Sequence, residues 1–191
     1  GGELLHTHML SRDIESQPFI YVNELFGAEP RIAVSDNGLS SGEISGNLKQ
    51  LQKEHQVIAG PVIAGDSFEQ LLVFVSHTGQ FVGYDEANTK IAWVQDSSAT
   101  HVGNLVEVAP SSYLTTLDDS RLALFNMDLD GAHKVWEKPL PNSIVAAPYI
   151  SEGLVYLALK EEVLVYNQKG IKRLAISPGE EVISVSGHVK A

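Results

Sequence analysis

The chain has 191 residues, of which 43% are hydrophobic and 19% are charged, a composition typical of a globular protein with a buried core. Its 24 acidic and 13 basic side chains give a net charge of −11, which argues against nucleic acid or an anionic membrane surface as the main partner. Cysteine is absent, which excludes disulfides, cysteine-ligated zinc and thiol catalysis, and no apolar run approaches the length of a membrane span.

A hairpin-like pattern recurs along the chain with a spacing of 41 residues. Residues 71–85 form two short runs of β-type residues on either side of Gly79, which is typical of a hairpin. The pattern also occurs at 31–42, where Gly38 takes the place of Gly79, and again at 113–126 and 154–167. The recurrence predicts hairpin turns near residues 37–38, 78–79, 119–120 and 160–161.

Further β-type runs flank these hairpins. One run precedes them at 18–21, 57–65 and 144–150, and another follows them at 90–93 and 134–136. The polar segment 40–56 is compatible with either a short helix or a degenerate strand. Four strands in 40–45 residues is the size of a β-propeller blade, whereas a β-sandwich or a simple meander of hairpins does not require a fixed repeat.

The sequence therefore predicts an all-β fold, a partial or partner-completed β-propeller with about four blades and the start of a fifth. An N-terminal tail at 1–17 precedes repeats at 18–191. The expected blades cover residues 18–56, 57–98, 99–141 and 142–180, and the next begins at 181–191.

A short motif after the second hairpin resembles a known family. Asp85, Lys90 and Trp93 match the Asp-x-x-Thr-Gly-Lys-x-x-Trp motif of PQQ-like, or quinoprotein-type, β-propeller repeats, although Asn88-Thr89 stands where Thr-Gly is usual. The third copy keeps Lys and Trp, ending at Trp136, and the fourth has Leu174 in the Trp position. The resemblance implies that Trp93 and Trp136 are largely buried and dock one blade against the next.

One segment has the spacing of a calcium-binding loop. Its oxygen-bearing side chains are Asn126, Asp128, Asp130 and Glu137. His133 takes a position where an apolar residue is usual, and Pro139 prevents a following helix. The repeat places the segment on a strand-turn-strand, where Asp and Gly are ordinary turn residues, so a plain turn is the favoured interpretation and calcium the alternative.

The remaining polar residues form no recognisable catalytic pattern. His6 and His8 lie in the terminal tail, and no Ser and Asp accompany a histidine in a nucleophile motif. The adjacent pairs Glu161-Glu162 and Glu180-Glu181 point to opposite faces of a strand and cannot form an acid–base dyad on their own. We therefore predict no catalytic, cofactor-binding or metal-binding residues, no cofactor and no enzyme activity.

The expected function is that of a non-catalytic scaffold or protein-binding module, part of an extracytoplasmic assembly or receptor in the periplasm, a lumen or the secreted space. One alternative is a luminal or extracellular sensor that dimerises through open blade edges. A second is a fragment of a quinoprotein dehydrogenase, a class that the resemblance links to a quinone and usually a vicinal cysteine pair, which this chain lacks.

The repeat number also predicts how the protein assembles. Four and a fraction blades leave two unpaired faces, which are expected to expose the apolar side chains of Ile20, Val182, Ile183 and Val185. The chain is therefore expected to be a piece of a longer protein or to pair with another chain. Further blades, a second copy or a protein partner with a basic or neutral surface would cover these faces.

Overall fold

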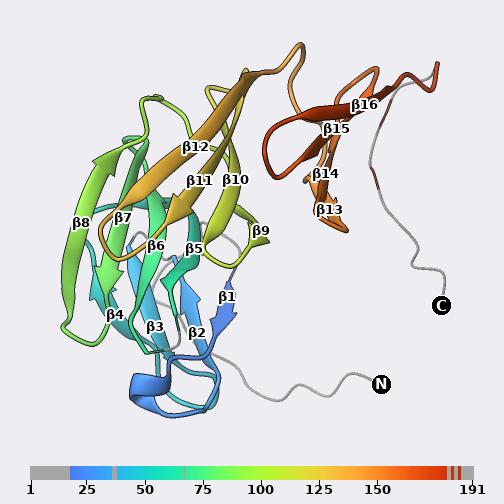
Figure 1. The fold of residues 1–191 in the computed structure, drawn as a ribbon. Coiled ribbons are helices and arrows are strands. Elements are labelled where there is room, and N and C mark those ends of the chain that lie inside the picture. The colour runs from blue at the N-terminus through green and yellow to red at the C-terminus, as the bar shows by residue number, and fades with distance from the viewer. Residues whose placement is uncertain (1–17, 36–37, 67, 180–181, 183–184, 186–191) are drawn as a thin grey trace, which may run out of the picture. The chain divides into compact units, whose positions relative to one another are not determined.

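Almost all regular structure in the described residues is β-strand. The computed structural model describes residues 18–35, 38–66, 68–179, 182 and 185, and among them a single 3₁₀ turn, η1 (Glu24–Phe26), accompanies sixteen strands. The strands form four antiparallel sheets of four strands each, which we number in chain order (Figure 1).

Sheet 1 contains β1 (Phe19–Tyr21), β2 (Arg31–Val34), β3 (Leu39–Glu43) and β4 (Lys49–Gln52). Sheet 2 contains β5 (Val57–Gly65), β6 (Gln70–Ser76), β7 (Gln80–Asp85) and β8 (Lys90–Asp96). Sheet 3 contains β9 (Val106–Ala109), β10 (Ser112–Leu117), β11 (Arg121–Met127) and β12 (Ala132–Pro139). Sheet 4 contains β13 (Tyr149–Ser151), β14 (Leu154–Ala158), β15 (Val163–Asn167) and β16 (Lys172–Ile176).

Each sheet is a meander in which neighbouring strands are consecutive in the chain. The predicted turns at 78–79, 119–120 and 160–161 are confirmed, since each connects two antiparallel partners. The predicted turn at 37–38 falls partly on residues 36–37, which lie outside the described residues, although β2 and β3 on either side of it pair as expected. The ambiguous segment 40–56 is strand: it contributes most of β3 and all of β4, and Leu51 packs against the core of sheets 1 and 2.

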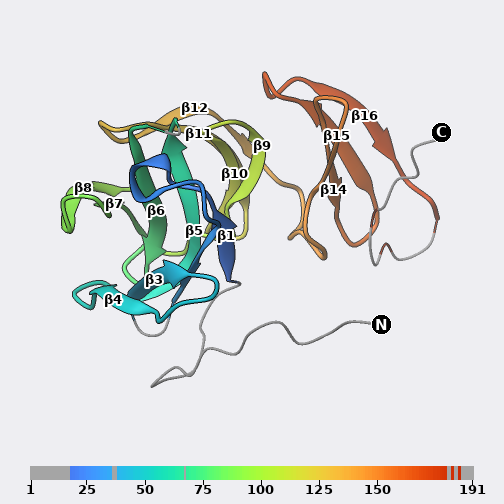
Figure 2. The same cartoon turned by 90° about the horizontal axis from the view of Figure 1, so that it is seen from below.

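The chain divides into two compact units. The first comprises residues 1–105 and 127–132, and the second comprises 106–126 and 133–191. In the first unit, β1 and β5 lie side by side, and β4 and β8 lie at the outer edges of their sheets (Figure 2). The residues that fill the space between sheets 1 and 2 are Tyr21, Ala33, Leu39, Val57, Leu72, Phe74, Val82 and Tyr84.

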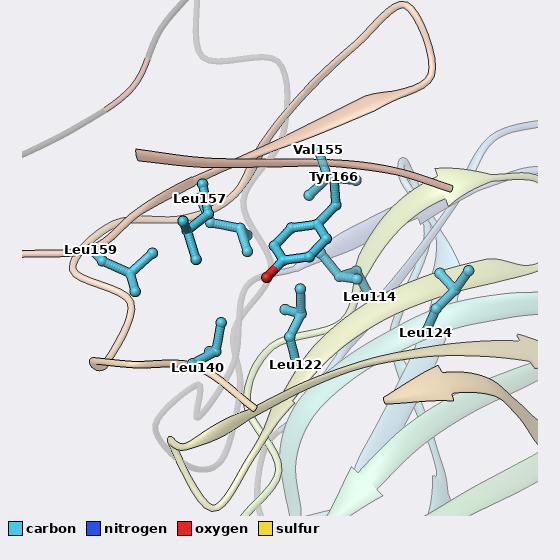
Figure 3. Packing of buried hydrophobic residues seen from close by; sticks show 9 residues of the cluster. Leu114, Leu122, Leu124, Leu140, Val155, Leu157, Leu159 and Tyr166 are labelled. Carbon is cyan, nitrogen blue, oxygen red and sulfur yellow. The ribbon is translucent and has the colours of Figure 1, made fainter. Parts of the chain in front are cut away.

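The second unit has a core of its own, formed by leucines, valine and tyrosine from sheets 3 and 4 (Figure 3). Its buried members are Leu114, Leu122, Leu124, Leu140, Val155, Leu157, Leu159, Leu164 and Tyr166. In both units these side chains alternate along their strands with residues of the opposite face, as a pleated strand requires.

The start of the expected fifth blade falls largely outside the described residues, and Ile183 is one of those outside. The expectation that Val182 is exposed is wrong, because its side chain is only 8% exposed and its amide donates to the Lys160 carbonyl at 2.9 Å. Val185 is half-buried, whereas Ile20 is 62% exposed, as expected. No helix in the described ranges is long and apolar enough to cross a membrane.

Candidate functional site

Glu86, which directly follows β7, joins sheet 2 to sheet 1 through three hydrogen bonds. Its carboxylate accepts from Tyr21 Oη at 2.8 Å, from an Arg31 guanidinium nitrogen at 2.7 Å and from Ser41 Oγ. The three donors lie on β1, β2 and β3, so one carboxylate binds three neighbouring strands of the facing sheet. Glu86 and its ion-pair partner Arg31 have side chains only 4% and 13% exposed.

This network predicts a change of stability at high pH. Burial, followed by the nearby negative charge of Glu86, raises the pKa of Tyr21 from 10.0 to about 12. Because the folded protein holds the proton more tightly, the stabilisation is complete below pH 10 and is lost as the pH rises from 10 to about 12. We expect the free energy of unfolding to fall more steeply over this range than in Tyr21→Phe, as measured by urea denaturation at each pH.

In the second unit, Trp136 of β12 packs against sheet 4. Its Nε1 donates to the Gln168 carbonyl at 2.8 Å, and its ring stacks on Tyr166 with centroids 6.4 Å apart. Gly170, with φ +70°, lies beneath the ring, since a Cβ there would approach Trp136 Cδ2 to 2.7 Å. The predicted docking contact is therefore present, but the side chain is half-buried rather than largely buried.

Trp93 of β8 is also half-buried, and its ring covers Gly83 of its own sheet. Its Nε1 atom is buried and has no hydrogen-bond partner among the described residues. The two tryptophans therefore differ: Trp136 makes a polar bond to the next sheet and Trp93 makes none within the described part of the chain.

Three of the four side chains of the calcium-like segment, those of Asn126, Asp128 and Glu137, have protein partners. Asp128 Oδ1 accepts the amides of Asp130 and Gly131, which is an ordinary Asx turn. Asn126 accepts from Ser112 Oγ at 2.8 Å. Lys134 and Arg121 both bind Glu137, at 2.7 and 2.9 Å, and their hydrogen bonds, that of Lys134 first, hold the pKa of its carboxyl below the usual range.

Within the described ranges, the structure groups no three His, Asp or Glu side chains in a way that could hold a metal. His6, His8 and the Glu180-Glu181 pair lie outside the described residues.

A pocket of about 480 Å³ lies entirely in the first unit and forms the first candidate interaction surface. Its lining comes from η1, the β5–β6 connection and the start of β6, the end of β7, the β7–β8 connection and the start of β8, and the β11–β12 turn. Three apolar side chains at its rim are strongly exposed: Leu25 at 57%, Phe68 at 65% and Leu129 at 38%. Exposed apolar side chains gathered around a concave site are typical of a binding surface.

The outward face of sheet 4 is the second candidate surface. Tyr156 and Val163 alternate along their strands with residues of the buried core, so their side chains point away from the core. Leu174 pairs with Val165 and Ile176 pairs with Val163 across β15 and β16, so these residues lie on the same outward face. This end face comprises Tyr156, Val163, Val165, Leu174 and Ile176, of which Val165 is buried and Leu174 and Ile176 are exposed. All five residues of β16 are exposed, and Leu174 and Ile176 are 52% and 46% exposed.

Solved structures with similar architecture decide the fold. Cps50 (Swd1) of Myceliophteria thermophila, described as a β-propeller domain, matches 78% of this chain and 57% of its own with 10% identity and a TM-score of 0.62. The chain has the fold of a partial β-propeller. BamB from Moraxella catarrhalis matches 86% of this chain and 50% of its own, with 14% identity and a TM-score of 0.60.

A third similar structure is a protein complex. BBS1N, solved in complex with ARL6DN, matches 92% of this chain and 58% of its own, with 17% identity and a TM-score of 0.66. The chain thus spans 50–58% of the length of these three propellers. No protein-family model matches the sequence. No curated protein matches it either.

Sequence reasoning missed both the Glu86 network and the pocket. The 41-residue repeat carries no sign of Glu86, because the equivalent positions hold Met127 and Gln168. The pocket had a weak signal, since Leu25, Phe68 and Leu129 are apolar residues in segments that otherwise read as polar turns.

Proposed function

We propose that the protein is a non-catalytic β-propeller scaffold that binds other protein elements through the end face of sheet 4. The exposure of Leu174 carries this proposal. In the repeat, Leu174 takes the position of Trp136, and Trp136 packs against the sheet that follows its own. Leu174 would pack in the same way against a sheet that follows sheet 4, yet it is 52% exposed.

Contact with a partner would stabilise the protein by covering this apolar surface. Covering Leu174 and Ile176 would remove apolar surface from water at roughly 25 cal/mol per Å². β16 is also an edge strand whose outer backbone groups can pair with an added strand. Further blades of the same protein, a second copy or a protein partner are the elements that fit such a face.

One similar structure supports a binding role without identifying the partner of this chain. BBS1N was solved in complex with another protein, and BamB and Cps50 share the fold. The proposal includes PQQ-like repeats, in which Asp85 caps the β7–β8 turn by accepting from the Asn88 amide at 2.9 Å. We further propose that the protein lies outside the cytoplasm and uses no cofactor. Its expected organisation is a tail at 1–17 followed by blades at 18–56, 57–98, 99–141 and 142–180, with a further blade beginning at 181.

The oligomeric state of the 191-residue chain tests this proposal. We expect concentration-dependent self-association in sedimentation velocity, because the exposed part of the end face, at Leu174 and Ile176, can pair with another copy. Replacing Leu174 and Ile176 together by Asp should shift the protein to monomer, because association would then bury charge. Val135→Asp is the matched control, since Val135 is 49% exposed on β12 and lies outside the end face.

The proposal would be wrong if the unaltered chain stayed monomeric at all accessible concentrations. It would also be wrong if the Leu174 and Ile176 substitutions had no more effect on association than Val135→Asp.

A further inference from the structure

We propose that the pocket of the first unit binds a basic, apolar segment of a partner protein, with the segment's large apolar side chain inserted between Leu25, Phe68 and Leu129. This inference goes beyond the end-face proposal because it concerns a different surface, on a different unit, and assigns the chemistry of the occupant.

The three apolar rim residues are held in place by hydrogen-bonded turns. Asn23 Oδ1 accepts the Leu25 amide at 3.1 Å, and Asp66 Oδ1 accepts the Phe68 amide at 2.8 Å. Asp128 closes the turn that carries Leu129, because its Oδ1 accepts the amides of Asp130 and Gly131. A surface fixed before binding loses little conformational entropy when a partner arrives.

Two further hydrogen-bonded contacts fix these turns relative to one another. Gln70 Nε2 donates to the Val22 carbonyl at 2.9 Å, which ties the start of β6 to the segment before η1. The Gln95 amide makes two bonds to the backbone of Ala132, at 2.5 and 2.9 Å, and so ties the β11–β12 turn to β8. The rim is therefore one preorganised surface within the first unit.

The charges around the pocket favour a bound segment of positive charge. Glu69, Asp85 and Lys90 line the pocket, and four more acidic residues lie within two residues of Leu25, Phe68 or Leu129 in the sequence. The four are Glu24, Asp66, Asp128 and Asp130. Two backbone hydrogen bonds, from Glu69 and Phe68, lower the pKa of Asp66, so this charge persists into acidic solution.

A basic segment therefore gains electrostatic attraction at this rim, and an acidic one is repelled. An apolar side chain is needed as well, because the pocket itself is lined by Leu71 and Ile91 in addition to the three rim residues. The volume lies in the range of sites that enclose large side chains or small ligands.

Fluorescence anisotropy with three synthetic ten-residue peptides tests the proposal. The probe alternates Lys with Leu and Phe, one comparison peptide replaces Leu and Phe by Ser, and the other replaces Lys by Glu. We expect the Lys-apolar peptide to bind at least roughly tenfold more tightly than either comparison, with an affinity that falls as salt rises.

Protein variants assign this binding to the pocket. Phe68→Ser and Leu129→Ser should each weaken binding about tenfold, the usual effect of removing a central apolar contact. Val94→Ser is the matched control, because Val94 is 44% exposed on β8 but does not line the pocket. Glu69→Gln combined with Asp130→Asn should reduce the salt dependence, whereas Glu107→Gln with Glu161→Gln should not.

Equal binding of the Lys-apolar and Glu-apolar peptides would overturn the proposal, as would Phe68→Ser binding no more weakly than Val94→Ser. All measurements use the Leu174→Asp, Ile176→Asp background, whose circular dichroism must match the unaltered chain. Peptide binding therefore tests only the pocket, and oligomeric state tests only the end face, so the failure of one proposal can be told from the failure of the other.

Discussion

Replacing Glu86 by alanine is expected to destabilise the protein by about 3–5 kcal/mol, the usual cost of removing one partner from a buried ion pair. The substitution leaves the Arg31 guanidinium without its 2.7 Å partner in a place where its side chain is only 13% exposed. It also removes the acceptor of Tyr21 and Ser41, so polar groups on three strands of sheet 1 lose a bond at once. Urea denaturation followed by tryptophan fluorescence measures the effect.

Two variants separate the charge from the hydrogen bonds. Tyr21 binds one oxygen of Glu86, and Ser41 and Arg31 bind the other, so Glu86→Gln keeps an acceptor for only one side of the network and removes the ionic attraction to Arg31. Its destabilisation should therefore be smaller than that of Glu86→Ala but clearly above zero. Glu69→Ala is the matched control, because Glu69 is exposed and should change stability by no more than about 0.5 kcal/mol. If Glu86→Ala were as mild as Glu69→Ala, sheets 1 and 2 would be held together by apolar packing alone.

The repeat made the sheets predictable from sequence. Alternation of apolar residues sets which face of a strand is buried, and the recurrence of Gly38, Gly79 and the aromatic positions sets the hairpin register. Even the degenerate first copy follows the rule, because β4 is an outer strand and needs only part of one face, through Leu51, to be apolar.

The contacts between sheets were not predictable, because the repeat position that makes them changes residue type. Glu86 binds sheet 1 through its carboxylate, and Gln168, two repeats later, binds sheet 3 through its carbonyl to Trp136 and its side-chain amide to Val108. Met127, the repeat between them, is apolar and fully buried. A position that holds an acid, a thioether and an amide in successive repeats leaves no pattern for periodicity to detect.

The pocket was hidden for a different reason. Its rim is built from connections that are far apart in sequence and that each read as an ordinary turn closed by Asn23, Asp66 or Asp128. In a meander of antiparallel strands, alternate connections lie at the same end of the sheet, so β5–β6 and β7–β8 meet there. Only the arrangement of the strands brings Leu25, Phe68 and Leu129 together.

Replacing Trp136 by alanine is expected to destabilise the second unit by about 3 kcal/mol. This value is at the lower end for a large aromatic, because the side chain is half-buried. The loss comprises the stacking on Tyr166, the cover over Gly170 and the hydrogen bond to the Gln168 carbonyl. The measurement is urea denaturation followed by far-ultraviolet circular dichroism, since the substitution removes one of the two tryptophans.

Phenylalanine in place of each tryptophan isolates the contribution of the indole N–H. Trp136→Phe keeps an aromatic ring on Tyr166 but removes the 2.8 Å bond to Gln168, so it should cost about 1 kcal/mol more than the same change at Trp93. Trp93→Phe removes a buried donor that has no partner among the described residues, so the loss of ring area is partly offset by a relieved desolvation cost. Equal costs at the two positions would mean that the Trp136 hydrogen bond adds nothing to the docking of sheet 3 on sheet 4, and that the tryptophan of this repeat acts by its apolar surface alone.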